Sequence, residues 1–340
     1  MVNYCIPAHR GSVLSLTSTV VGGAPLLCSG GHDGKVRMWR RTAAGTLAPA
    51  GALAPGAGSI FSLSAHACTD GSTILAAGTF SRTLHAWRVA ATEAGETRVV
   101  ETLLSSREHT GWVRATAVAD EHSCCSIGCN RLLAWRLPGG PPPDLPEREL
   151  PLYEDATAAD QAAQRSHDIL SIGWRDGVLA AGSVDGALRC WRADVVGATT
   201  GPAALLGCRP AHWTAHADRV AAVALSAEGA LLSAGYDRLV RAWRAPDSAE
   251  LGAAWQLSRE ARLPAGRPTA LAVGGARVHC GTSDGEVRSL DAASLELASA
   301  PMRVTQGARA TAVAVLGTNT MTGTLVAGDS AGMLHLGHEP

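Results

Sequence analysis

The stretch that decides the fold is Leu231-Leu232-Ser233-Ala234-Gly235-Tyr236-Asp237-Arg238-Leu239-Val240-Arg241-Ala242-Trp243. It begins as a short apolar strand and enters a turn of small residues that Asp237 closes. It leaves the turn as a second, alternating strand that ends on Trp243. Glycine and aspartate suit tight turns, and alternation with a period of two is typical of strands. The stretch therefore predicts two consecutive strands joined by a turn.

The same pattern fills the chain. Clear copies run from Cys28 to Trp39, Ala76 to Trp87, Cys125 to Trp135 and Ala180 to Trp191, and weaker copies run from His279 to Leu290 and from Val326 to Gly337. Successive copies end 48, 48, 56, 52, 47 and 47 residues apart. A period of roughly 40–50 residues with short alternating strands indicates propeller blades. We expect an all-β, seven-bladed propeller that takes up residues 1–340 as one unit.

These residues resemble the WD40 repeat β-propellers over essentially the whole chain. In that family a loop His, a strand Ser or Thr, a turn Asp and a strand Trp form a hydrogen-bonded tetrad inside each blade. The resemblance implies full tetrads in the first and fifth repeats and a partial one in the fourth, where Ala181 replaces the Ser. The implied members are His9, Ser29, Asp33 and Trp39; His216, Ser233, Asp237 and Trp243; and His167, Asp185 and Trp191.

Other repeats depart further from the family pattern. The third keeps His109 and Trp135 but has Cys129 at the Asp position, the second has Ser81 there, and the sixth clearly keeps only Asp284. The Asp that usually follows the Trp is replaced by Arg40, Arg88, Arg136, Arg192 and Arg244. We interpret this Arg series first as solvated strand ends whose stems cover apolar surface, and otherwise as a belt that attracts anions.

The two ends of the chain complement each other. Residues 2–6 predict a spare strand, whereas the last repeat stops after its third strand. Pairing of the two would close the ring without exposed strand edges, and the family resemblance implies the same closure. Residues 138–166 form the one long insertion, which is rich in acidic residues. It is either a functional loop or a tolerated insertion.

Composition limits the function classes. The net charge of −1 argues against direct nucleic-acid binding, which depends on neutralised phosphates. Nine cysteines without small-domain spacing, the lack of a signal core and the lack of a long apolar run favour an intracellular protein without a membrane span. We expect the cytoplasm, with the nucleus as the alternative.

No pattern favours catalysis. Two G-x-S-x-G matches, at Gly281–Gly285 and Gly328–Gly332, are in register with the turns of the repeats and precede strands, whereas a nucleophile elbow precedes a helix. Cys124, Cys125 and Cys129 lack the second ligand pair of a metal site. The recurrent histidines are more simply structural. We expect no catalytic residue, no cofactor and no metal.

The family analogy favours a non-catalytic scaffold or adaptor that binds other proteins or peptides as a subunit of a larger complex. One alternative is the substrate receptor of a ubiquitin ligase, although the Trp-Asp-x-Arg signature of that subgroup is absent. A less favoured alternative is an enzyme with a site at the propeller mouth. Side chains beside the turn Asp positions and the first strands predict the partner surface: Trp112, Arg219 and Tyr236, flanked by Phe80 and His32.

Overall fold

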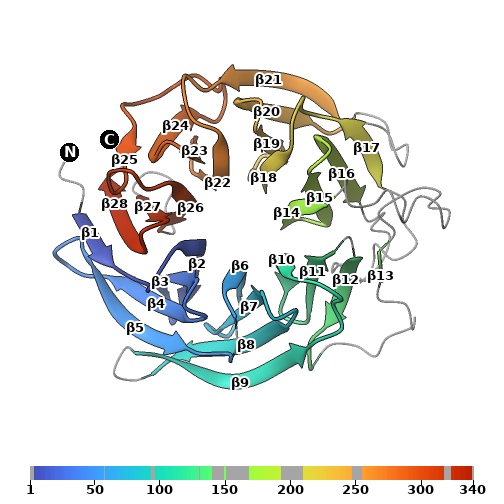
Figure 1. The fold of residues 1–340 in the computed structure, drawn as a ribbon. Helices are drawn as coiled ribbons and strands as arrows, with labels where there is room; N and C mark the ends of the chain where they lie inside the picture. Colours follow the sequence, from blue (N-terminus) through green and yellow to red (C-terminus); the bar gives the residue numbers. More distant parts are fainter. Residues whose placement is uncertain are drawn as a thin grey trace.

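The computed structural model describes residues 4–56, 58–92, 96–129, 131–139, 149–150, 168–192, 210–246, 255–317 and 323–338. These residues form seven four-stranded antiparallel sheets arranged as a ring around a central opening (Figure 1). The expected seven-bladed, all-β propeller is thus confirmed. None of the described segments forms a helix of the length and apolarity that a membrane crossing requires.

Each of the first four blades takes consecutive strands, ordered from the opening outward. The first is built from β2 (Val13–Val21), β3 (Ala24–Gly31), β4 (Val36–Arg41) and β5 (Leu47–Leu53). The second contains β6 (Ile60–Ala67), β7 (Thr73–Thr79), β8 (Leu84–Ala91) and β9 (Thr97–Ser106). The third contains β10 (Val113–Asp120), β11 (Ser123–Gly128), β12 (Arg131–Arg136) and β13 (Glu149–Leu150). The fourth contains β14 (Ile169–Arg175), β15 (Val178–Ser183), β16 (Ala187–Arg192) and β17 (Ala211–Thr214).

The remaining blades follow the same order except at the seam. The fifth contains β18 (Val220–Leu225), β19 (Leu231–Gly235), β20 (Leu239–Arg244) and β21 (Gln256–Arg262). The sixth contains β22 (Pro268–Gly274), β23 (Arg277–Thr282), β24 (Glu286–Asp291) and β25 (Met302–Arg303). The seventh combines β26 (Ala310–Leu316), β27 (Thr324–Asp329) and β28 (Met333–His338) with β1 (Tyr4–Pro7) from the start of the chain.

The first strand completes the last blade. β1 pairs antiparallel with β28, from Tyr4 opposite Leu336 to Pro7 opposite Met333. Ile6 packs against the cluster that joins the seventh blade to the first, and the backbone N–H groups of Ala8 and His9 donate to the carbonyl of Gly332. Of the 138–166 insertion, the structure describes only residues 138–139 and β13, so both interpretations of that loop stay predictions.

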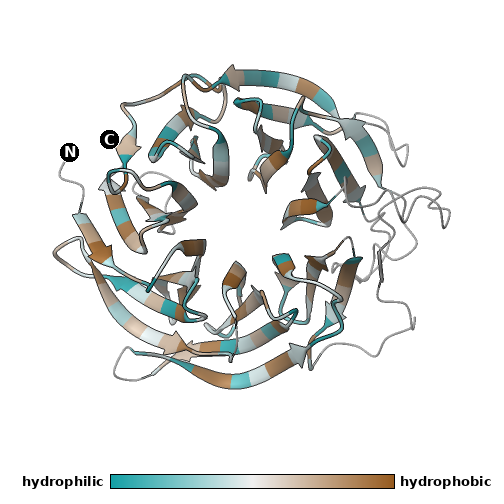
Figure 2. Cartoon of the chain, in the orientation of Figure 1, coloured by the Kyte–Doolittle hydropathy of each residue, from teal (hydrophilic) through white to brown (hydrophobic). Residues whose placement is uncertain are grey.

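The hydrophobic core lies between the blades. The buried apolar side chains form seven clusters, and each cluster takes its members from two neighbouring blades. Cys124 and Cys125 illustrate this, because the first packs toward the second blade and the second toward the fourth. The outer strand β21 carries several hydrophilic side chains and is exposed over most of its length (Figure 2). A blade therefore buries its two faces only when it has a neighbour on each side.

Every inner strand carries a bulge at its second residue. The pairing register of the first and second strands shifts at this point in all seven blades. A bulge leaves one residue out of the ladder and re-aims its side chain. The bulged residues are Leu14, Phe61, Arg114, Leu170, Ala221, Thr269 and Thr311. They form one level around the rim of the opening, with large side chains in the first four blades and small ones in the last three.

Removal of residues 1–8 should destabilise the ring. The truncation deletes the outer strand of the seventh blade, its ladder hydrogen bonds and the packing of Ile6 and Ala8. We expect the free energy of unfolding to fall by at least about 3 kcal/mol, or the protein to aggregate through the exposed edge of β28. Urea unfolding and light scattering measure the two outcomes. The matched control removes only residues 1–3, which precede β1, and should behave as the full chain; equal stability of the two truncations would contradict closure through β1.

Candidate functional site

A continuous chain of hydrogen bonds crosses the first blade. His9 lies in the loop before β2, and its Nδ1 is 2.8 Å from Oδ1 of Asp33 in the β3–β4 turn. Its Nε2 is 2.8 Å from Oγ of Ser29 on β3, to which Nε1 of Trp39 on β4 donates at 2.9 Å. The His, Ser and Trp are buried, so each polar atom gains a partner that replaces water. The chain of bonds ties the loop, the turn and the two middle strands together.

The fifth blade repeats this arrangement with nearly identical distances. Nδ1 of His216 is 2.9 Å from Oδ1 of Asp237, and its Nε2 is 2.8 Å from Oγ of Ser233. Nε1 of Trp243 donates to the same hydroxyl at 2.9 Å. The best sequence copies are thus also the two blades in which the structure brings all four residue types together.

The third and fourth blades contain parts of the arrangement. In the third, His109 and Trp135 share the hydroxyl of Ser126 at 2.7 and 2.6 Å, while Cys129 takes the turn position with a left-handed φ of 47°. In the fourth, His167 lies outside the described residues. Trp191 there is fully buried, and Asp185 accepts from Ser183.

A second row of contacts was missed by the sequence analysis. Arg37, Arg189 and Arg241 each stand four residues after the turn Asp of their blade, and each pairs with it. Arg189 is only 2% exposed and also donates to Oγ of Ser183 at 2.8 Å, where Ala181 has removed the tetrad hydroxyl. The Asp-x-x-x-Arg spacing, which the sixth repeat also keeps at Asp284 and Arg288, is the signal that could have revealed this row.

The seventh blade uses a different acid and base. Ala331 stands at the turn position, and the fully buried carboxylate of Asp329, two residues earlier, lies 2.8 Å from Nε2 of His335. His335 occupies the strand position that Arg37 and Arg241 occupy in the first and fifth blades. An acid–base contact at the same level therefore persists without the recognisable tip Asp.

The Arg residues that follow the Trp positions partly bind their own blades. Arg40 donates to the carbonyls of Val21 and Ala24, at the turn between β2 and β3. Arg88 donates to Ser72 at the equivalent turn of the second blade. These contacts favour the interpretation of the series as local supports rather than as a belt that attracts anions.

The buried acids and histidines have shifted pKa values. Burial lowers the pKa of His9 and His216, because the charged imidazolium is disfavoured away from water. Burial alone would favour the neutral form of Asp33, but hydrogen bonds from His9, Arg10 N–H and Arg37 lower its pKa to about 2. The folded state therefore holds neutral histidines against ionised aspartates, as expected for structural hydrogen bonds.

The residues predicted for the partner surface occupy one face of the ring. We call it the turn face: the loops before each inner strand and the turns between the second and third strands. Phe80, in the β7–β8 turn, stacks on Trp112, in the loop before β10, with ring centroids 4.6 Å apart. Phe61 completes the cluster, at 5.9 Å from Phe80 and 5.8 Å from Trp112. The guanidinium of Arg114 lies 5.2 Å from the Trp112 ring centroid.

The stack stays accessible although its members support one another. Phe80 is 45% exposed and Trp112 is 41% exposed, which places both among the most exposed large apolar side chains of the described residues. The two rings therefore lie at the surface and are not folded into gaps between blades, which was the alternative. Neither Phe61 nor Arg114 was selected from the sequence, because only the bulge in β6 and β10 directs them to the rim beside the stack.

A second cluster on the turn face surrounds Tyr236 in the β19–β20 turn. The guanidinium of Arg219 lies 5.1 Å from its ring centroid, and that of Arg267, from the loop before β22, lies at 5.5 Å. His32 lies apart from both clusters, is exposed, and its Nδ1 is 3.0 Å from Oγ of Ser59. The structure thus divides the predicted surface: Phe80 and Trp112 meet, Arg219 and Tyr236 meet, and His32 contacts neither pair.

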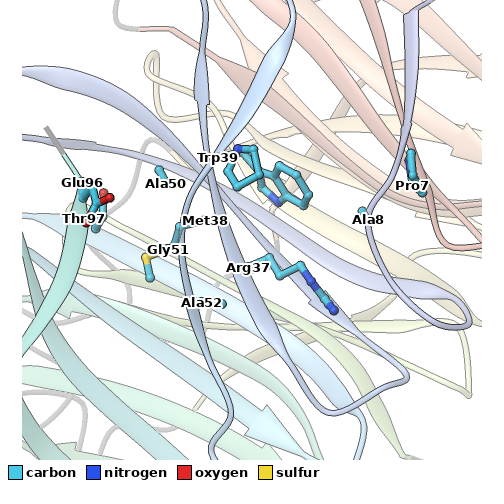
Figure 3. A pocket seen from close by; sticks show the side chains of 11 residues that line it. Pro7, Ala8, Arg37, Met38, Trp39, Ala50, Gly51, Ala52, Glu96 and Thr97 are labelled. Carbon is cyan, nitrogen blue, oxygen red and sulfur yellow. The ribbon is translucent and has the colours of Figure 1, made fainter.

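A hollow of about 580 Å³ lies on the circumference of the ring (Figure 3). Its walls come from the end of β1, from β4 and β5, and from the start of β9. Trp39, Met38 and Ala50 supply apolar surface, and the guanidinium of Arg37 is already held by His9 and Asp33. The hollow therefore offers mainly packing surface and is distant in the fold from the clusters of the turn face.

The cysteines show no ligand geometry in the described part of the chain, where no group of three or more His, Cys, Asp or Glu could hold a metal ion. Cys124 and Cys125 are fully buried on opposite sides of β11, and burial raises the pKa of Cys125 to about 12. Burial therefore favours the neutral form of this thiol.

Comparisons with known proteins agree with this geometry. The family described as WD domain, G-beta repeat, or WD40, matches residues 2–40 and 207–244. The chain is similar in structure to the β-propeller domain of Cps50 (Swd1) from Myceliophteria thermophila, with a TM-score of 0.70, 16% identity, and coverage of 98% of this chain and 97% of that one. No curated protein matches the sequence. Since 1528 solved chains match, the fold is widely used and does not by itself specify a function.

Substitution of Asp237→Ala should lower the free energy of unfolding by about 1–3 kcal/mol, because it removes the carboxylate partner of the buried His216. Asp284→Ala is the matched control. Asp284 occupies the same turn position in the sixth blade but is exposed and makes no tetrad contact. The buried Thr282 hydroxyl that donates to it keeps the carbonyl of Glu286 as an acceptor, so loss of Asp284 should cost within about 0.5 kcal/mol. Urea unfolding of both variants checks this, and equal stability of the two would contradict a structural role for the tetrad.

Stability should fall in two steps on acidification. As the pH drops below the ordinary His value of 6.5, the unfolded chain takes up protons that buried His9 and His216 refuse, so unfolding becomes easier. A second loss follows as the pH falls from 3.8 toward about 2, where Asp33 becomes protonated in the folded state. Urea unfolding across pH 7.5 to 2.5 measures both steps. A double His9→Gln and His216→Gln variant should have a smaller upper step, which retains the contribution of His85, whose pKa is also lowered by burial; an unchanged upper step in that variant would show that other groups cause it.

Proposed function

Because this chain carries WD40 repeats within a seven-bladed propeller, we propose that it is a non-catalytic scaffold that binds a partner protein through the turn face. The exposed stack of Phe80 and Trp112 carries the proposal. Two large rings held half out of water cost hydration free energy in an isolated protein, and such residues dominate the binding energy of protein interfaces. The stack is therefore proposed as the centre of the interface.

The remaining predicted residues extend this surface. Arg219 and Tyr236 form the second contact area, and His32 forms a third. Arg and Tyr are, with Trp, the residue types most often found at energetic centres of interfaces. The scaffold under them supports the proposal, because several tips are hydrogen-bonded to the connection that leads into the next blade: the hydroxyl of Ser59 donates to the carbonyl of His32, and Leu263 N–H donates to that of Arg238. A preformed surface loses little conformational entropy on binding.

A scaffold role is also supported by what the polar residues of the site do. The four tetrad side chains bond to one another, and Thr269 and Thr311 at the rim donate to the neighbouring carbonyls of Ala310 and Gly328. The polar groups of the tetrads and of these two threonines therefore form hydrogen bonds that stabilise the fold. As part of the same proposal, the chain acts as a subunit of a larger complex in the cytoplasm or the nucleus, where buried thiols such as that of Cys28 stay reduced.

The proposal is tested by partner capture with a variant in which Phe80 and Trp112 are both replaced by alanine. Immobilised wild-type protein and variant are incubated with lysate of the source cells, and retained proteins are quantified by mass spectrometry. We expect the specific partners to fall at least about tenfold with the variant, which corresponds to about 1.4 kcal/mol or more, while the melting temperature stays unchanged.

The matched control is a double Val100→Ala and Leu257→Ala variant, which removes exposed apolar side chains from the outer strands β9 and β21. It should capture partners as the wild-type protein does. Partners that remain bound to the Phe80/Trp112 variant, or that leave both variants equally, would refute the turn face as the interface.

A further inference from the structure

Charge is unevenly distributed between the two faces of the ring. On the turn face, the exposed cations of the described residues are Arg10, Lys35, Arg82, Arg107, Arg219, Arg238, Arg267 and Arg309. Against these eight stand three exposed carboxylates, namely Glu108, Asp218 and Asp284. The turns of the opposite face are nearly balanced, with exposed Arg41, Arg175, Arg192 and Arg244 against Asp70, Glu96, Asp176, Glu228 and Glu296. Among the residues that the structure describes, the turn face thus carries more exposed cations than carboxylates, although the net charge of the chain is −1.

Two of these cations stand where the backbone favours glycine. The residue after the turn Asp position is left-handed in the first, fourth, sixth and seventh blades, where it is Gly34, Gly186, Gly285 and Gly332, with φ between 70° and 87°. In the second and fifth blades, Arg82 and Arg238 adopt the same conformation, each with φ of 67°. A residue with a Cβ is disfavoured there, whereas glycine is not.

Neither Arg serves the fold through an ion pair that the described residues show. Both are exposed, and Arg238 bonds to the connection between the fifth and sixth blades through its backbone carbonyl, which accepts from Leu263 N–H. Glycine would keep that bond, as Gly285 does with Val304. An Arg at these two positions therefore costs conformational free energy, and its guanidinium makes no ion pair with the described residues that would offset this cost.

Both arginines follow an aromatic residue of the turn face closely in the chain. Arg82 is two residues from Phe80, and Arg238 is two residues from Tyr236. The rings are themselves flanked by the guanidiniums of Arg114, Arg219 and Arg267. A guanidinium that stacks on a ring keeps its N–H edges free for a planar carboxylate, which it binds through two parallel hydrogen bonds. Apolar surface and carboxylate receptors thus alternate along one face.

We propose that the partner of the turn face is an acidic peptide segment. Its carboxylates pair with Arg82 and Arg238, and an apolar side chain between acidic residues packs on the stack of Phe80 and Trp112. This assignment rests on the proposed scaffold function and specifies the chemistry of its partner. A nucleic acid fits less well, because phosphate-backbone binding draws on an overall positive field that a chain of net charge −1 does not supply.

A selection of displayed peptides tests the acidic chemistry of the partner separately from the proposed interface. A random peptide library is selected on the wild-type protein, and sequences that also bind the Phe80/Trp112 alanine variant are discarded. We expect the surviving peptides to be rich in Asp and Glu around an aromatic or aliphatic residue. Surviving peptides that are neutral or basic would overturn the acidic partner but leave the scaffold function standing. A failure to enrich any peptide that distinguishes the two proteins would count against the proposed interface itself.

The arginines are then tested with a synthetic peptide of glutamate pairs separated by single leucines, labelled for fluorescence anisotropy. The double Arg82→Gly and Arg238→Gly variant should bind this peptide about tenfold more weakly, while its melting temperature stays equal or rises because the left-handed strain is relieved. Arg82→Lys with Arg238→Lys should retain most of the binding. Arg175→Gln with Arg192→Gln, which removes two charges from the opposite face, should bind as the wild-type protein does.

Three results would refute the assignment. The first is undiminished binding of the glutamate peptide by the double Gly variant. The second is equal binding of a matched peptide with glutamine in place of glutamate. The third is tighter binding of an oligothymidine than of the glutamate peptide, which would identify the turn face as a nucleic-acid surface.

Discussion

The structure depends on the fact that a blade cannot bury its own apolar side chains. Each of the seven core clusters is shared by two neighbouring blades, so no blade owns a complete core. An open row of blades would leave two apolar faces and two strand edges in water, and this cost is removed only when the row closes. The pairing of β1 with β28 holds the ring closed through backbone hydrogen bonds, because the start and the end of the chain share one sheet.

The hydrogen-bonded tetrad is a local solution that the ring does not require in every blade. The first and fifth blades contain it in full, yet the second and sixth, which lack the loop His, still form four-stranded sheets. In the sixth blade Asp284 and Arg288 keep the spacing of the Asp–Arg pairs, but Arg288 pairs with Glu286. Packing between blades therefore carries the fold. The Asp185–Arg189 pair and the His335–Asp329 contact join turns to strands where a tetrad is partial or missing, and they occupy the same level of the ring.

The number and kind of blades could be predicted from the sequence because the features that identify each repeat lie close together in the chain. Alternation, a glycine-rich turn and a terminal Trp lie within thirteen residues, as in Leu231–Trp243, and local preference and global fold agree there. The contacts of the candidate site are not local in this sense. Tyr236 meets Arg267 across a blade boundary, and Phe61 reaches Trp112 only because a bulge redirects it. In the seventh blade Asp329 stands two residues before the turn position at which the repeat pattern places the Asp, so the pattern does not identify it.

The bulge that recurs in all seven inner strands has a consequence for how such a protein changes over time. It places one residue per blade outside the ladder, at a common height around the rim, so its identity is only loosely coupled to sheet pairing. Leucine, phenylalanine, arginine, alanine and threonine all occupy this position within one chain. The residues of the rim can therefore be substituted one blade at a time while the core stays unchanged. New binding specificities can arise in this way through a series of variants that all still fold.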